Sequence, residues 1–358
     1  MTKVKIYGAG SIGNHLANAA VNKGWEVVLC DIDDMALERT RTSIYPSRYG
    51  HFDEKIKLYN IKDAPKTGFD WIFIGTPPNS HLKIAIEALD YNPKGILIEK
   101  PMATPDLKGC EELLDKIKKS NTKVFVGYDH VVAKSTKYFV DKAKSLNNFQ
   151  YLDVFFREHW DGIFKAHYWI NGPEDTYLGY WKEGGGALAE HSHGLNLWQH
   201  IALEIGCGKV IKVKATLDYV KTDKVNYDKL AMLHLETEKG LKGSVVQDVL
   251  TMPTLKSIRL QGDNRSLEWE CLTNPYSDKV SIIGKEIDEK VFEKTRPDDF
   301  IYELDHLEEN LTSYKKSIIS VEHGLDTMLV IAAAHKSFKT GKAITIDYTL
   351  GYNEKALK

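Results

Sequence analysis

The chain has 358 residues, more than one ordinary hydrophobic core accommodates, so we expect two domains. A hydrophobic content of 42%, a charged content of 27% and a formal net charge of −2 exclude a basic protein that binds nucleic acid or an anionic membrane surface, and favour a small neutral or mildly charged partner. The four cysteines lack CxxC or CxxH spacing, which argues against a disulfide framework and a zinc site.

The N-terminal residues read as structure rather than as a targeting signal. A β-rich run begins at Val4, so we expect no signal peptide. No apolar run reaches the roughly 18 residues that a membrane helix needs. We therefore expect a cytoplasmic protein with no membrane partner and no nucleic-acid partner.

The first elements have the order strand, glycine turn, helix, strand. Residues 4–8 are β-rich, GAGSIG occupies 8–13, and residues 14–24 carry apolar residues at helical spacing before Gly24 ends the helix. Residues 25–33 then predict a second strand. This is the context in which the fingerprint GxGxxG is specific for a dinucleotide.

Each glycine of the fingerprint has a physical role. Gly8 permits the tight turn, Gly10 lets the backbone approach a pyrophosphate, and Gly13 allows the helix to pack closely on the strand. Asp31 ends the second strand, where a carboxylate accepts hydrogen bonds from an adenosine ribose and repels a 2′-phosphate, so we expect NAD rather than NADP. The cofactor contacts predicted here are Gly8, Gly10, Ser11, Ile12, Gly13, Asp31 and Ile32.

Strands and helices continue to alternate. Residues 71–75, 95–99 and 123–127 are apolar throughout, and helices are predicted over about 80–89 and 106–119. Continuous apolar strands of this kind are typical of a parallel sheet that is covered on both faces. The predicted fold class is therefore α/β, with a doubly wound N-terminal sheet.

Two strand ends carry polar residues where an open parallel sheet binds its ligand. GTPPNSH at 75–81 predicts a proline-rich turn that caps the next helix, which does not exclude contact with a cofactor. EKP at 99–101 places a lysine directly after a buried strand. The cofactor contacts predicted at these two ends are Thr76, Pro77, Asn79, His81, Glu99 and Lys100.

After about residue 128 the pattern changes to closely spaced β-rich segments without intervening helices. This predicts a mainly antiparallel sheet with one polar or partner-facing side. The segments are 151–157, 209–220, 229–236, 241–249 and 279–284.

The sequence resembles the Gfo/Idh/MocA family of glucose-fructose oxidoreductases and inositol dehydrogenases. The resemblance implies a Rossmann domain over 1–128, a second α/β domain with an open, mainly antiparallel sheet over 129–343, and a tail over 344–358. It also implies NAD(P)-dependent chemistry on a sugar or cyclitol hydroxyl, and a homo-oligomer, dimer or tetramer, formed through the second sheet. The matching stretches are 7–13, 30–33, 75–81, 99–101, 126–130, 184–190 and 323–342.

Residues 157–186 form an aromatic-rich insertion. Between 159 and 200 lie four of the seven tryptophans and five of the thirteen histidines. Aromatic clusters of this kind either pack internally or hold sugar rings, and both alternatives stay open. The substrate contacts predicted in and near this segment are Tyr128, Arg157, Lys165, His167, Trp169 and Trp181.

The resemblance also implies catalytic residues. Lys100 matches the family's active-site lysine, whose ammonium hydrogen-bonds to the reacting hydroxyl or exchanges a proton with it, and Glu99 is expected to hold that lysine in place. After the triple glycine, most of the family has an aspartate and, four residues later, a histidine. Here Glu190 takes the place of the acid, but the fourth residue after it is Gly194.

Helix geometry selects among the remaining histidines. On one continuous helix, Glu190 and His193 lie about 60° apart, whereas His191 points about 160° away from His193. EHSH also fits a family variant of acid, any residue, serine and histidine. We assign proton exchange to His193, with His191 as the alternative, and place His200 too far along the helix. No third ligand is evident for a metal site, so none is expected.

These residues predict hydride transfer between NAD and a secondary hydroxyl carbon of a sugar, nucleotide sugar or cyclitol. His193 exchanges the hydroxyl proton, Glu190 orients the substrate or the histidine, and Lys100 polarises the same oxygen. The alternative is a catalytically silent NAD-binding sensor of the same fold. Retention of EKP at 99–101 favours the enzyme.

Overall fold

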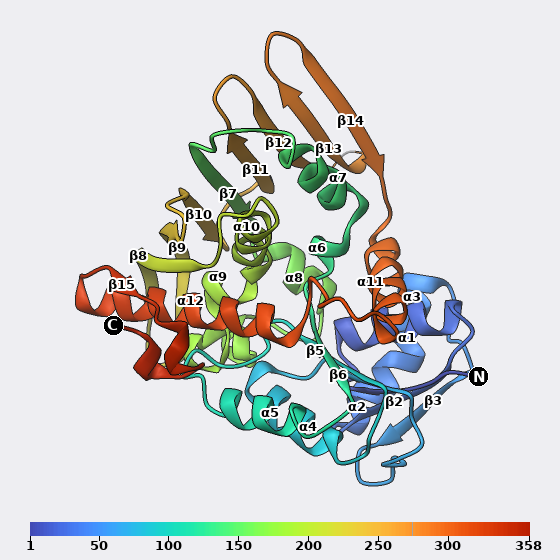
Figure 1. The fold of residues 1–358 in the computed structure, drawn as a ribbon. Helices are drawn as coiled ribbons and strands as arrows, with labels where there is room; N and C mark the ends of the chain where they lie inside the picture. Colours follow the sequence, from blue (N-terminus) through green and yellow to red (C-terminus); the bar gives the residue numbers. More distant parts are fainter. Residues whose placement is uncertain (274) are drawn as a thin grey trace.

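Six parallel strands form the first sheet, in the order β3-β2-β1-β4-β5-β6 (Figure 1). The computed structural model describes residues 1–273 and 275–358. The strand order reverses between β1 and β4, and a crevice outside the carboxyl ends of the strands at such a reversal is where open α/β sheets bind ligands. The strands are β1 (Lys3–Tyr7), β2 (Glu26–Asp31), β3 (Ile56–Asn60), β4 (Trp71–Ile74), β5 (Gly95–Glu99) and β6 (Lys123–Gly127).

Helices cover this sheet because its strands are buried over almost their whole length. Every residue of β4 and β5 is buried, as the continuous apolar runs predict. In Figure 1 the sheet lies between α4 and α5 on one side and α1, α3 and α11 on the other. The first-domain helices are α1 (Ser11–Asn22), α2 (Asp34–Arg39), the π-helical turn η1 (Thr40–Ile44), α3 (Tyr45–Tyr49), α4 (Pro78–Leu89) and α5 (Cys110–Ile117).

The second sheet has nine strands in the order β14-β13-β12-β11-β7-β10-β9-β8-β15. Only β7 and β10 pair in parallel; the other pairs are antiparallel. The predicted α/β fold with an open, mainly antiparallel second sheet is therefore confirmed. Its strands are β7 (Tyr151–Arg157), β8 (Val210–Lys221), β9 (Asn226–Thr237), β10 (Lys242–Asp248), β11 (Leu255–Gln261), β12 (Ser266–Thr273), β13 (Tyr276–Ile283), β14 (Ile287–Glu293) and β15 (Ile344–Thr345).

Helices pack on one face of this second sheet. Trp198 of α10 is fully buried, and its indole N–H donates to the carbonyl of Leu152 in β7 at 2.7 Å. The helices from here to the C-terminus are α6 (Asp129–Val132), α7 (Lys134–Ala143), α8 (Asp161–Ala166), η2 (Pro173–Asp175), η3 (Tyr177–Gly179), η4 (Trp181–Glu183), α9 (Gly186–Glu190), α10 (Ser192–Glu204), α11 (Arg296–Leu311), α12 (Val321–Thr340), η5 (Tyr348–Leu350) and η6 (Glu354–Ala356). None of the helices in 1–273 and 275–358 combines the length and apolar character that a bilayer crossing requires.

Several element boundaries differ from the sequence expectations. Helix α5 begins at Cys110 rather than near residue 106, because Leu107 and Gly109 both have positive φ and cannot continue a helix. Strands β3, β11, β12 and β14 were not predicted. In β14 most residues are exposed and many are charged, so the strand carries no apolar pattern. Residues Ile344–Thr345, placed in a tail, pair with β8 instead.

The C-terminal third of the chain returns to the first sheet. The backbone N–H of Val126 in β6 donates to the carbonyl of Ile319 at 2.9 Å, just before α12 begins. Helix α11 packs against α1 and α6. Both sheets are therefore held against one cleft by α11 and α12.

A buried ion pair holds α11 to the second sheet. The ammonium of Lys294 is 6% exposed and lies 3.1 Å from Asp278 of β13 and 3.8 Å from Asp299 of α11. Replacing Lys294 with Met leaves two buried carboxylates without their cation, so we expect the free energy of unfolding to fall by about 3–5 kcal/mol.

Denaturant unfolding monitored by tryptophan fluorescence measures this loss. Lys118→Met, which removes an exposed pair with Asp115, is the matched control and should leave the midpoint unchanged. Equal midpoints for the two variants would contradict a stabilising role for Lys294.

Candidate active site

One cavity of about 1390 Å³ extends from the glycine turn after β1 to the second sheet. Pockets for one drug-sized ligand typically enclose about 300–1,000 Å³, so this cavity has room for an extended cofactor and a second molecule. Its lining includes most of the predicted cofactor contacts: Gly8, Gly10, Ser11, Ile12, Asp31, Ile32, Thr76, Pro77, Asn79, Glu99 and Lys100.

The glycine turn adopts the geometry that a dinucleotide requires. Gly8 has a φ of +99°, and a Cβ there would lie 2.6 Å from the carbonyl oxygen of Gly75. A Cβ on Gly13 would lie 1.8 Å from the carbonyl oxygen of Gly8, so Gly13 serves close packing, as predicted, and does not line the cavity. Gly10 has open space around its Cβ position and forms the N-cap of α1. The N-terminal end of α1 can therefore receive an anion.

Two polar side chains complete this end of the cavity. The carboxylate of Asp31 accepts from the backbone N–H of Ala9 at 2.7 Å, which fixes it beside the turn. Arg48 donates to the hydroxyl and to the carbonyl of Ser11, at 2.8 and 3.1 Å, and so places a cation at the start of α1. Arg48 was not predicted, because nothing in its local sequence connects it with a residue 37 positions away.

His81 connects two turns next to the cavity. It is 1% exposed and outside the cavity lining, and its ring nitrogens lie 2.5 Å from the carbonyl oxygen of Thr76 and 3.1 Å from that of Pro101. Burial lowers the pKa of His81 to about 4. His81 thus orders the two turns through Thr76 and Pro101, and a cofactor contact of its own stays a prediction.

Lys100 and Glu190 form a nearly buried pair across the two domains. The Lys100 ammonium donates to the backbone carbonyl of Glu190 at 2.8 Å and to its carboxylate at 3.0 Å, with side chains 11% and 14% exposed. The hydroxyl of Tyr177 donates to the other carboxylate oxygen at 3.0 Å. The Lys100 ammonium is thus held by Glu190, while the backbone N–H of Lys100 donates to the Glu99 carboxylate at 3.4 Å. Glu190 is engaged with Lys100 rather than with His193.

The helix after the triple glycine is broken at His191. Helix α9 ends at Glu190, His191 has φ −91° and ψ 23°, and α10 begins at Ser192. The angular argument assumed one continuous helix and is therefore wrong. Both His191 and His193 line the cavity, and an Nε2 contact of 3.3 Å joins His191 to the carbonyl oxygen of Glu158. His200 is buried and lies outside the lining, as expected.

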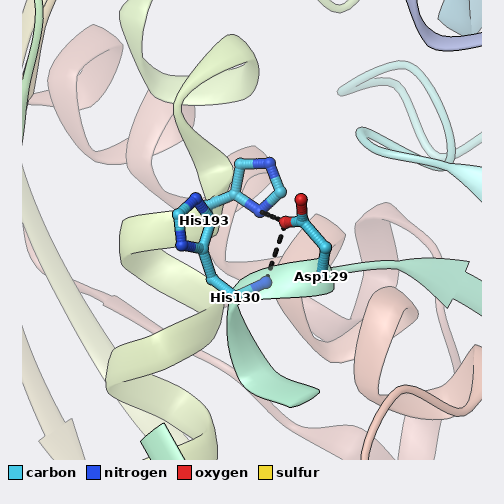
Figure 2. Close-up of side chains that lie close together, drawn as sticks. All are labelled: Asp129, His130 and His193. Carbon is cyan, nitrogen blue, oxygen red and sulfur yellow. Dashed lines mark hydrogen bonds and ion pairs between the residues drawn. The ribbon is translucent and has the colours of Figure 1, made fainter. Parts of the chain in front are cut away.

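His193 faces an acid that the sequence did not connect with it. Its Nδ1 lies 3.5 Å from Oδ1 of Asp129, and the same oxygen accepts from the backbone N–H of His130 at 2.8 Å. Figure 2 shows the imidazole of His193 pointing toward this carboxylate. Burial lowers the pKa of His191 to about 4 and holds the pKa of His193 well below its ordinary value.

Spacing along the chain predicted no third metal ligand near the histidines, but the fold brings two candidate ligands beside His193. Potential ligand atoms of Asp129, His130 and His193 lie within 4.8 Å of one another. The rings of His130 and His193 meet edge to face, with centroids 4.7 Å apart. Asp129 and His130 follow β6, more than sixty positions before His193, and spacing along the chain cannot reveal such a group.

Four of the six predicted substrate contacts do not line the cavity within the described residues. Tyr128 is fully buried and its hydroxyl donates to Ser192, while Arg157 pairs with Asp248. Lys165 is exposed, and the Trp181 ring stacks on His335 with centroids 4.3 Å apart. For Trp181, internal packing is thus the better interpretation.

The other two predicted contacts line the cavity at its cofactor end. The ring of Trp169 lies 5.2 Å from the guanidinium carbon of Arg39, and Arg39 pairs with Asp33 next to the end of β2. His167 directly follows the short helix α8. Residues that the sequence did not single out form the opposite wall, where the Lys256 ammonium lies 2.7 Å from Glu158.

The N-terminal domain and the whole fold each match known proteins. Residues 2–128 match the model of GFO_IDH_MocA, an oxidoreductase family with an NAD-binding Rossmann fold, which confirms the predicted resemblance and the NAD-type cofactor site over that domain. Many solved structures share the fold, and three of them match over nearly the full chain as follows. At identities below 20%, this likeness establishes the fold alone.

The first is a WlbA dehydrogenase from Bordetella pertussis in complex with NADH and UDP-GlcNAcA, which is 19% identical with a TM-score of 0.71 over 96% of this chain and 98% of that chain. An oxidoreductase from Agrobacterium radiobacter in complex with NAD+, L-tartaric acid and magnesium is 18% identical, with a TM-score of 0.73 over 96% and 98%. A levoglucosan dehydrogenase in complex with NADH and L-sorbose is 15% identical, with a TM-score of 0.76 over 97% and 99%.

Packing leaves no room for a side chain at residue 194, which is glycine. A Cβ on Gly194 would lie 2.6 Å from Cβ of Phe156 in β7, inside the contact distance of two carbons. We therefore expect Gly194→Ala to lower the free energy of unfolding by about 1–3 kcal/mol through overpacking.

Gly162→Ala is the matched control for this prediction. Gly162 lies within α8, and its added Cβ would meet only a Glu158 oxygen at 3.9 Å. Thermal unfolding of both variants should show a loss for Gly194→Ala alone. Unchanged stability of that variant would mean that Phe156 moves aside without cost.

Proposed function

Because residues 2–128 belong to the NAD-binding oxidoreductase family GFO_IDH_MocA, we propose that this protein is an NAD-dependent dehydrogenase or reductase. Its substrate is a sugar, nucleotide sugar or cyclitol that reacts at a secondary hydroxyl carbon. The observation that carries the proposal is a single cavity that joins the glycine turn to Lys100 and His193.

The cofactor end of the cavity fits NAD. The start of α1 and the guanidinium of Arg48 supply N–H donors and positive charge for the pyrophosphate. Asp31 stands at the end of β2, where it accepts hydrogen bonds from the ribose and disfavours an added 2′-phosphate. When bound, NAD accepts or supplies the hydride.

Lys100 is the proposed donor to the reacting oxygen. An ammonium carries three N–H groups, and two of the three serve the carbonyl and carboxylate of Glu190. The third can point into the cavity and polarise a hydroxyl or carbonyl oxygen. Glu190 therefore acts by holding Lys100, and Tyr177 holds Glu190 in turn.

His193 is the proposed proton acceptor in the oxidation direction. Burial keeps its imidazole neutral, so one ring nitrogen is free of a proton and can accept the proton of the hydroxyl. In the reduction direction the same imidazole, once protonated, returns the proton. His191 lines the same cavity but contacts the carbonyl of Glu158, and we assign it to the wall of the substrate pocket.

The chemistry of the remaining wall supports a hydroxyl-rich ligand. Lys256 and Glu158 place a donor and an acceptor beside the ring of Phe156, and an apolar face next to paired polar groups is how proteins hold sugars. The neighbours that bind UDP-GlcNAcA and L-sorbose support the same substrate class. We also propose that the protein forms a homo-oligomer through the open face of the second sheet. The proposed location is the cytoplasm.

Loss of Lys100 or His193 should abolish turnover without abolishing cofactor binding. We expect Lys100→Met and His193→Ala each to lower kcat at least about a hundredfold, because each removes a group that acts on the reacting oxygen. Absorbance of reduced nicotinamide, followed with a panel of sugars, inositols and nucleotide sugars, measures turnover, and NAD titration measures binding. Lys165→Met and His234→Ala, on exposed side chains outside the cavity, are the matched controls.

Two outcomes would overturn parts of this proposal. Tight NAD binding without turnover of any substrate in the panel would favour the sensor. Wild-type turnover of His193→Ala would reassign the proton transfer to another group.

The cofactor preference has its own test at Asp31. Replacing Asp31 with Ser removes the acceptor for the ribose and the repulsion of a 2′-phosphate. We expect the KM for NAD to rise about tenfold, as loss of a charge-assisted hydrogen bond implies, and the ratio of NADP to NAD activity to rise with it. An unchanged ratio would remove Asp31 from cofactor selection.

A further inference from the structure

Resting on the proposed role of His193, we propose that Asp129 is the positioning residue of the proton transfer. Its carboxylate holds a proton on Nδ1 of His193 and turns the unprotonated Nε2 toward the reacting hydroxyl. This role falls to a residue directly after β6, and not to the acid that precedes the histidine in α9.

The backbone places the Asp129 carboxylate. Asp129 opens α6 at the carboxyl end of β6, and its side chain is 8% exposed. Oδ1 accepts from the N–H of His130 at 2.8 Å and lies 3.5 Å from Nδ1 of His193 (Figure 2). Contacts of this kind are often long before substrate binds and tighten in the reacting complex. A carboxylate on one imidazole nitrogen sets the tautomer and leaves the other nitrogen as the base.

The other acid near Lys100 has a different partner. Both carboxylate oxygens of Glu190 are used, one by Lys100 and one by Tyr177. Nδ1 of His193 is buried and makes no hydrogen bond within 1–273 and 275–358, and the Asp129 carboxylate at 3.5 Å is the acid that faces it. The site therefore contains two pairs of a cation-forming group and an acid, Lys100 with Glu190 and His193 with Asp129.

The Asp129 carboxylate raises the pKa of the neighbouring His193. Burial lowers the pKa of His193 first and most, and Asp129 is the neighbouring charge that raises it. The carboxylate therefore strengthens the imidazole as a base. The titratable groups around His193 are Asp129 and His130 of α6, Tyr128 just before α6, Lys100 after β5 and Lys256 of β11. Glu303 of α11 lies near Asp129.

Glu303 favours an ionised Asp129. It is fully buried, and neither of its carboxylate oxygens has a hydrogen-bond partner in the described part of the chain. Burial and the nearby carboxylates Glu99 and Asp129 raise the pKa of Glu303 well above its ordinary value. Asp129 accepts a backbone N–H, whereas neither oxygen of Glu303 has a donor within the described residues, so Glu303 is the acid that burial disposes to hold a proton.

The proton and the electrons balance across the step. In oxidation, the hydroxyl O–H bond breaks and its proton forms the N–H bond at Nε2 of His193. The C–H bond breaks with its electron pair, which leaves as hydride to the nicotinamide, and the C–O single bond becomes a carbonyl. The imidazolium that results carries one positive charge, which the Asp129 carboxylate stabilises without taking up the proton.

The test replaces Asp129 with Asn, which keeps the size and an oxygen acceptor but removes the charge. We expect kcat to fall about ten- to a hundredfold with little change in KM. Because the charge raises the pKa of His193, its loss should move the acidic limb of the pH profile of kcat to lower pH. Asp326→Asn, which neutralises a buried carboxylate outside the cavity, is the matched control and should move neither quantity.

A readout that does not depend on turnover accompanies the kinetics. Nitrogen-15 NMR of histidine in the unreacted protein should show His193 as the Nδ1–H tautomer in the wild type and a lower titration midpoint in Asp129→Asn. NAD titration and thermal unfolding establish that the variant is folded. Asp129→Glu, which restores the charge, should recover part of kcat and return the acidic limb toward its wild-type position.

Three results would overturn the inference. The first is an Asp129→Asn variant with the wild-type kcat and the wild-type acidic limb of the pH profile. The second is a His193 that carries its proton on Nε2. The third is a wild-type protein that loses turnover with EDTA and regains it with Zn²⁺, which would make the three residues of Figure 2 a metal site. Wild-type turnover of His193→Ala is a separate result, because it removes the proposed base itself. An inactive His193→Ala beside an unaffected Asp129→Asn contradicts the role of Asp129 alone.

Discussion

The ion pair between Lys100 and Glu190 is the contact on which the site depends. Lys100 follows β5 of the first sheet, and Glu190 ends α9, which packs against the second sheet. An ammonium and a carboxylate that are both about nine-tenths buried are costly unless each is paired, so this contact favours the arrangement in which the two residues meet. The same contact places a cation beside the cofactor end of the cavity.

Packing on the second sheet determines how the histidines enter this cleft. Phe156 of β7 occupies the space that a side chain at residue 194 would need. The chain instead breaks its helix at His191 and presents residues 191 and 193 to the cavity. The bulky side chain of Phe156 on β7 therefore requires a glycine at residue 194 of α10.

Sequence patterns predicted those parts of the fold that depend on residues close together in the chain. Apolar runs identified five of the six strands in the first sheet, and the glycine turn identified the cofactor end, because each depends on residues within about ten positions. Strands such as β14 were missed because most of their residues are exposed and charged. The partners of Lys100 and His193 were missed for another reason: Glu190 and Asp129 lie 90 and 64 positions away from them, and only the packing of two domains brings them together.

Two carboxylates in one cleft acquire different roles from different surroundings. Glu190 accepts from an ammonium and a phenol hydroxyl and is thereby fixed, whereas Asp129 accepts from the backbone N–H of His130 and lies 3.5 Å from the imidazole of His193. Glu303 is fully buried, its oxygens have no hydrogen-bond partner within 1–273 and 275–358, and burial raises its pKa well above the ordinary value. A neutral imidazole beside a retained carboxylate is the state from which a base accepts a proton most readily. The distribution of donors among three buried acids thus decides which of them can assist the histidine.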